Sequence, residues 1–284
     1  MEPIKIGINK DLEKVKEIID SYSFERKLNI EEENYNDRDI FSFSIGKRKT
    51  YDELILYDNL AHIVQDIIIK VYAKYLIVYR VNKICTDFNI SDREEIIVYS
   101  HNMLMNKNYF VKEKQFLNGE IVNYLIENRT LLVDGYLRFR LKDFNFLIDR
   151  AIEKSIEELT AEKEYKEFIK ILQYFIDIQE PKYDLVNVIL CDNDYRLMDE
   201  NNKIIENDFF SDIINELSYE GISKDDLLIS SLIVIAPKRL VVHIDEKDKD
   251  KEIVEVLTNI FKERINFCLG CDVCKVKIKM KKGK

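Results

Sequence analysis

The sequence predicts an α+β protein with a mainly helical middle and small mixed sheets towards its N- and C-terminal parts. Near both ends, apolar and polar residues alternate in short runs, for example over 4–8 and 240–244, and this is the period of a β-strand. Between these runs, apolar residues recur every three or four positions over long stretches, which is the helical period. The 284 residues include only 7 Gly and 3 Pro, so few sharp turns are available and long helices are favoured.

The first part of the chain predicts a small mixed unit. Isoleucines alternate with other residues over 4–8, which predicts a strand, and the apolar spacing over 12–19 predicts a short amphipathic helix. The acidic residues 31–33 are interpreted as a loop. Phenylalanine and serine then alternate over 41–45 and predict a second strand.

A helical region follows. The pairs Thr50 with Glu53 and Ser91 with Glu94 both fit a capping box, in which a hydroxyl residue is followed three positions later by an acid. Helices are therefore predicted to begin at these two hydroxyl residues. The apolar spacing over 116–126 predicts a third helix.

The longest periodic run extends over 137–175 and ends before Pro181, which cannot continue a helix. A single helix of this length would span roughly 65 Å at about 1.5 Å per residue. We therefore expect a bend or break near Thr160. The apolar stripe, which includes Phe144 and Phe168, is predicted to be buried against the helix expected over 60–78.

The last third of the chain changes character. Alternating apolar residues predict strands over 186–190 and 240–244, and a capping box at Ser223 predicts a helix that ends near Pro237. The pair Asn201–Asn202 predicts a hairpin turn. The pattern over 253–261 predicts one more helix.

We expect two regions, with the boundary after Lys182. The first, 1–182, holds the small N-terminal unit and the long helical run, and the second, 183–284, is an α/β region that ends in the cysteines; one single domain is the alternative. The chain has no basic and apolar leader, and its most apolar stretch, 63–81, carries too many charges to cross a membrane. A cytoplasmic protein is therefore expected.

Three of the five cysteines fall within seven residues, as Cys268, Cys271 and Cys274. Thiolates at two-residue gaps can converge on one metal ion, so these residues predict a zinc or iron–sulfur site. Two alternatives are ordinary reduced cysteines at a turn around Gly270 and a redox dithiol formed by the first two cysteines.

A structural zinc site needs four ligands, and the cysteine window supplies three. The fourth is expected from Cys191, His243 or Asp272. Bacterial ferredoxins continue the same spacing to a fourth cysteine and a proline, which are missing here, so the match to a ferredoxin motif is incomplete.

Two basic segments are candidates for binding an anion or a nucleic acid. Arg138, Arg140 and Lys142 follow Gly135 at an expected helix start and could clamp a phosphate, although nearby acids could pair with them instead. Lysines alternate with apolar residues over 275–281, which favours an edge strand over a basic arm. The net charge of −9 argues against a protein whose whole surface grips nucleic acid.

Three segments carry a resemblance to a known family. The segments 134–144 (DGYLRFRLKDF), 162–169 (EKEYKEFI) and 179–182 (QEPK) resemble the YtxC-like family of sporulation proteins. A weaker similarity extends through 235–238 (IAPK) and His243 to the cysteines. The resemblance implies an endospore-forming bacterium and a role in sporulation, but no activity and no catalytic residues that could be carried over.

These observations lead us to expect a cytoplasmic interaction or regulatory factor of sporulation with no established biochemical activity, and an enzyme is the less favoured class. Protein partners are expected, a membrane is not, and nucleic acid is the less favoured partner. The alternatives are a metal-dependent or nucleic-acid-processing enzyme and a metal-stabilised binding module. An enzyme requires a pocket with converging titratable groups, whereas a structural metal site requires four closed ligands.

Overall fold

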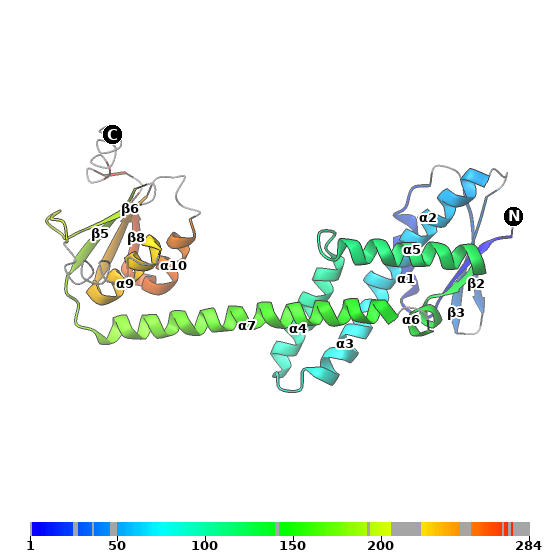
Figure 1. Cartoon of the computed structure of the whole chain (residues 1–284), viewed down its shortest axis with the longest axis horizontal. Coiled ribbons are helices and arrows are strands. Elements are labelled where there is room, and N and C mark those ends of the chain that lie inside the picture. The colour runs from blue at the N-terminus through cyan, green and yellow to red at the C-terminus, as the bar shows by residue number, and fades with distance from the viewer. Residues whose placement is uncertain are drawn as a thin grey trace. The chain divides into compact units, whose positions relative to one another are not determined.

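The computed structural model describes residues 2–24, 28–35, 37–45, 50–139, 142–191, 194–205, 223–244, 251–268, 270–271 and 274. Two compact units divide the chain between Ala161 and Glu162. Helices fill the middle of the chain and a small mixed sheet lies in each unit, so the predicted α+β class is confirmed (Figure 1). The domain boundary expected after Lys182 stays a prediction.

The sheet of the first unit has the strand order β2-β3-β1-β4, with β1 antiparallel to β3 and parallel to β4. Its strands are β1 (Ile4–Ile8), β2 (Leu28–Tyr35), β3 (Arg38–Ile45) and β4 (Thr130–Leu132). The three alternating isoleucines of β1 are completely buried, as a central strand requires.

The acidic segment 31–33 is not a loop, because it lies within β2 and pairs with β3 along its whole length. The prediction failed for a physical reason. The strand is at the edge of the sheet and most of its residues are exposed, so it carries no alternation of apolar and polar residues that could reveal it.

Helices form the rest of the first unit. They are α1 (Leu12–Asp20), α2 (Thr50–Ile67), the π-helix η1 (Ile68–Tyr72), α3 (Ala73–Ile84), α4 (Ile90–Met105), α5 (Val111–Asn128), α6 (Val133–Phe139) and the first part of α7 (Lys142–Ile178). The start of α4 differs from the expected one, because the side chain of Asn89, and not that of Ser91, accepts a hydrogen bond from the backbone N–H of Asp92 at 2.9 Å.

The helix α7 runs through Thr160 without the expected break. It contains no Gly or Pro, so no residue in it favours an interruption. The long apolar run divides instead before Lys142, between α6 and α7.

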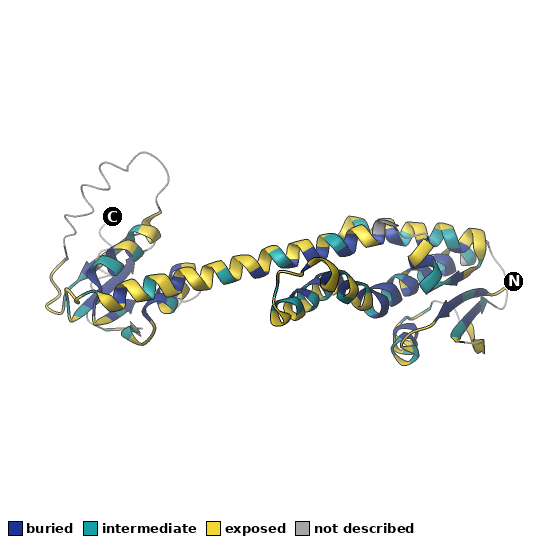
Figure 2. Cartoon of the chain, turned by 90° about the horizontal axis from the view of Figure 1, so that it is seen from below, coloured by how far each residue is buried: buried dark blue, intermediate teal, exposed yellow. Residues whose placement is uncertain are grey.

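The two phenylalanines expected in one buried stripe have different surroundings. Phe144 is 3% exposed in the core of the first unit, whereas Phe168 is 56% exposed, so the prediction is wrong for Phe168. In its second half, α7 carries apolar residues around most of its circumference, and the face that is buried there contains Ile169 and Ile176. Figure 2 shows exposed positions, in yellow, along the length of α7.

The sheet of the second unit has the order β6-β5-β7-β8, in which β5, β7 and β8 run parallel and β6 is antiparallel to β5. Its elements are β5 (Leu185–Cys191), β6 (Asp194–Met198), α9 (Lys224–Ile235), β7 (Arg239–His243), α10 (Glu252–Phe261), the short 3₁₀-helix η3 (Lys262–Arg264) and β8 (Ile265–Cys268). Parallel neighbours need a crossover, and α9 and α10 precede β7 and β8 as such connections.

Local signals predicted this unit well. The capping box of Ser223 and Asp226 opens α9, and the left-handed Asn202 lies in the turn that brings Ile204 back to pair with Met198. The alternating segment 275–281 lies outside the described residues. Within the described part of the chain, no helix has the length and apolar character needed to span a bilayer.

Candidate metal centre

The ends of two neighbouring parallel strands bring a histidine and a cysteine together. His243 is the last residue of β7 and Cys268 is the last residue of β8, and the two residues are partners in the strand register. Cys271 and Cys274 follow β8 directly and lie beside them. The group is therefore at the carboxyl edge of a parallel strand pair, where α/β folds commonly place their ligands.

The four ligand atoms form a compact group in which all lie within 4.8 Å of one another. The Sγ atom of Cys274 is 3.9 Å from that of Cys268 and 3.8 Å from that of Cys271. The Nδ1 atom of His243 is 3.3 Å from the sulfur of Cys274 and 3.4 Å from that of Cys271.

These distances match a tetrahedral metal site. With bonds of about 2.3 Å to sulfur and about 2.0–2.1 Å to nitrogen, tetrahedral zinc places two sulfurs roughly 3.8 Å apart and a sulfur and a nitrogen roughly 3.5 Å apart. The four distances given above are close to these values. The arrangement can hold a metal ion, and a disulfide is not formed because its sulfurs would be about 2.05 Å apart.

A hydrogen-bond chain orients the histidine. The Nδ2 group of Asn187, in β5, donates to the backbone carbonyl oxygen of Asp199 at 3.2 Å, so its Oδ1 atom faces the other way. That oxygen is 3.1 Å from Nε2 of His243, and it can only accept. Nε2 therefore carries a proton, and in the neutral imidazole Nδ1 presents its lone pair to the sulfurs of Cys271 and Cys274.

The four candidate ligands differ in burial. His243 is 2% exposed and Asn187 is 8% exposed, while the three cysteines are half-buried. Burial, together with hydrogen bonds to the other two thiols, raises the pKa of the Cys274 thiol to about 11. A metal ion that binds here must displace this proton.

The structure brings together the three predicted cysteines and His243, one of the three candidates for the fourth ligand. Asp272 and the side chain of Cys191, the other two candidates, lie outside the described residues. The sequence did not predict that Asn187 and Asp199 support His243 at this site. The one available signal was a single polar residue inside the apolar strand segment Leu-Val-Asn-Val-Ile-Leu.

The predicted anion-binding residues are in the first unit. Arg138, on α6, is exposed and lines a cavity that also contains Arg38 of β3. Arg140 and the side chain of Lys142 lie outside the described residues, so the three cannot be compared as a group.

Comparison with known proteins gives a family but no activity. A model of the YtxC-like family matches residues 58–266, which include His243 and end before Cys268. The chain is 24% identical over 162 residues to the uncharacterised protein YtxC of Bacillus subtilis strain 168, a match that covers 55% of this chain and 54% of that protein. The chain thus spans about half the length of this curated relative. No solved structure matches the chain. Because the family model covers most of the chain, the protein belongs to the YtxC-like family.

Proposed function

We propose that His243, Cys268, Cys271 and Cys274 bind one zinc ion and that this ion stabilises the second unit. The observation that carries the proposal is the convergence of one nitrogen and three sulfurs within 4.8 Å of one another, with four of their six distances close to those of a tetrahedral site. Three thiolates and one imidazole are a common donor set of structural zinc sites, whereas iron–sulfur clusters usually take four cysteines. Four protein ligands leave no open position for a substrate, which favours a structural over a catalytic role.

We further propose that the protein acts in the cytoplasm as an interaction factor in sporulation. Membership of the YtxC-like family supports this role. An exposed apolar stripe on α7, formed by Phe168, Ile171, Phe175 and Ile178, supports contact with a protein partner, because large apolar side chains gathered on a surface commonly mark such contacts. The net charge of −9 makes nucleic acid the less favoured partner.

Metal analysis tests the zinc proposal. The protein is purified without oxygen and without chelator from medium that contains both zinc and iron, and its metal content is measured by mass spectrometry. We expect one equivalent of zinc in the wild type and a loss of that zinc in His243→Ala and Cys271→Ser. The matched control is Cys85→Ala, which removes a buried thiol of the first unit and should leave the zinc content unchanged. A wild type without stoichiometric zinc would refute the proposal. Stoichiometric iron in its place would show that the site holds iron, as in an iron–sulfur cluster, and not zinc.

The sporulation role needs a separate test. A strain whose only copy of the gene carries Cys271→Ser is compared with the wild type and with the Cys85→Ala strain for the number of heat-resistant spores. We expect fewer spores only in the Cys271→Ser strain. Equal spore numbers in a complete gene deletion would overturn the sporulation role and leave the zinc site unaffected.

A further inference from the structure

A second candidate site lies in the first unit, remote in sequence from the cysteines. A cavity of about 480 Å³ is formed where β4 and α6 meet the start of β3 and the helix α5. Its lining includes two arginines, one carboxylate and several aromatic rings, among them Arg38, Asp134, Arg138, Tyr124 and Phe139. Its volume is within the range of small-molecule sites in proteins.

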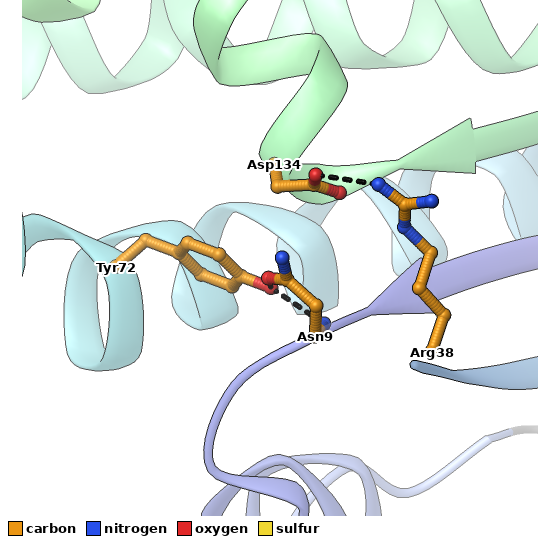
Figure 3. Close-up of polar contacts among 4 residues, drawn as sticks. All are labelled: Asn9, Arg38, Tyr72 and Asp134. Atoms are coloured by element: carbon orange, nitrogen blue, oxygen red, sulfur yellow. Dashed lines mark hydrogen bonds and ion pairs between the residues drawn. The ribbon is translucent and has the colours of Figure 1, made fainter. Parts of the chain in front are cut away.

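One arginine of the cavity is held by the carboxylate. Arg38 donates from Nη2 to Oδ2 of Asp134 at 2.7 Å, across 96 residues of sequence (Figure 3). Burial opposes ionisation of Asp134, but the hydrogen bond and the charge of Arg38 outweigh it and lower the pKa of this carboxyl. Asp134 is therefore charged, and the pair as a whole is neutral.

The pair does not use all the hydrogen-bonding capacity of Arg38. Only one nitrogen of the guanidinium donates to Asp134, and the buried Nε has no partner among the described residues. Below the pair, Tyr72 and Asn9 form their own hydrogen bonds, at 3.0 and 3.1 Å, and so do not compete for Arg38 (Figure 3).

The second arginine, Arg138, has no acidic partner within the described part of the chain. Asp134 and Asp149 are the nearby acids of the sequence whose side chains are described, and each is bound to another arginine: Asp134 to Arg38 and Asp149 to Arg80. The positive charge of Arg138 is thus not neutralised by either of them. With the neutral pair beside it, the lining residues that the structure describes carry one net positive charge, in a protein whose net charge is −9.

From this geometry we propose that the cavity binds a small organic anion, a phosphate ester or a carboxylate. The anionic group accepts hydrogen bonds from the exposed guanidinium of Arg138 and from those guanidinium N–H groups of Arg38 that neither bind Asp134 nor are enclosed by the fold. The organic part lies against the rings of Tyr124 and Phe139, and the latter is 74% exposed. The site is independent of the zinc proposal because all of its residues belong to the first unit.

Phenyl phosphate is a suitable probe because it joins a phosphate ester to an aromatic ring. Binding to the full chain is followed by two-dimensional ¹H–¹⁵N NMR at low ionic strength. We expect saturable shifts of the backbone amides of Thr130 and Gly135, which line the cavity. Benzyl alcohol, which has the ring but no charge, should cause no saturable shift of the same amides.

Arg138→Gln should weaken the binding of phenyl phosphate about tenfold or more, because it removes a charge-assisted hydrogen bond. The matched control is Arg239→Gln, which removes one exposed arginine from the second unit and should not change the affinity. Arg138 is exposed, so its replacement is not expected to disturb the fold, and circular dichroism of the variant verifies this. The proposal is overturned if millimolar phenyl phosphate gives no saturable shift, if Arg138→Gln binds like the wild type, or if Arg239→Gln weakens binding equally.

Discussion

Asn187→Leu should weaken metal binding about 10- to 100-fold, although Asn187 is not itself a ligand. Leucine has a similar volume and suits the apolar strand β5, but it cannot accept the hydrogen bond from Nε2–H of His243. The imidazole then either keeps a buried, unsatisfied N–H group, which costs about 1–3 kcal/mol, or changes tautomer and protonates the ligand atom Nδ1. A loss of 10- to 100-fold corresponds to about 1.4–2.7 kcal/mol, which agrees with that cost.

The zinc affinity of each variant is measured by competition with a chromophoric chelator under anaerobic conditions. Asn187→Asp keeps an acceptor at the same position, so it should retain most of the affinity. Ser231→Ala is the matched control, because Ser231 is 3% exposed in the same unit and its hydroxyl donates to its own helix, at Leu227. This variant should bind zinc like the wild type.

The outcomes separate orientation of the histidine from general stability. If Asn187→Leu binds zinc as tightly as the wild type, the hydrogen-bond chain does not position His243. If Ser231→Ala loses as much affinity as Asn187→Leu, the loss reflects destabilisation of the second unit and the argument from the tautomer fails.

Four further predictions follow from the described residues. Phe144→Ala should lower the free energy of unfolding by about 3–5 kcal/mol, while Phe168→Ala, at an exposed position of the same helix, should change it by no more than about 0.5 kcal/mol, as measured by urea denaturation. Zinc affinity should fall as the pH is lowered, because protons compete for the thiolates, and titrations at several pH values measure this. Burial raises the pKa of Tyr72 to about 12. In the unfolded chain this tyrosine has a pKa of about 10 and ionises first, so the stability of the folded protein should fall as the pH rises from about 10 to about 12. Urea denaturation at several pH values should show a shallower fall in Tyr72→Phe than in the wild type. Removal of zinc with a chelator should speed amide hydrogen exchange in β8 before it affects β1, and equal exchange in both strands would contradict a local role of the metal.

Much of the fold could be predicted because its signals are local. The capping box at Ser223 and the alternating isoleucines of β1 each lie within a few residues, and both were confirmed. Prediction failed where tertiary context decides. The exposed edge strand β2 has no apolar face, and the second half of α7 is apolar on more than one side, so only packing determines that Ile169 is buried and Phe168 is not.

In the candidate sites, too, residues close in sequence could be predicted and contacts made by the fold could not. The three cysteines were predicted as ligands because they lie within seven residues, and His243 could be named only as one of three possible partners. Its selection depends on the parallel pairing of β7 with β8, which no local pattern encodes. Asn187 is 56 residues from His243, and Arg38 is 96 residues from Asp134, so neither contact could be inferred from spacing along one sequence.

The position of the candidate metal site gives a physical reason why a closed set of ligands would be useful in this fold. The strand β8 has only four residues, pairs with β7 alone within the described sheet, and leaves Phe267 38% exposed. So short a strand at the end of a sheet gains little from its own hydrogen bonds and burial. A zinc ion bound by His243 and Cys268 would join the last residue of β7 to the last residue of β8, and its other two ligands would fix the segment that follows. Because the unfolded chain has no preformed site, the free energy of metal binding would act directly as folding free energy for this edge of the sheet.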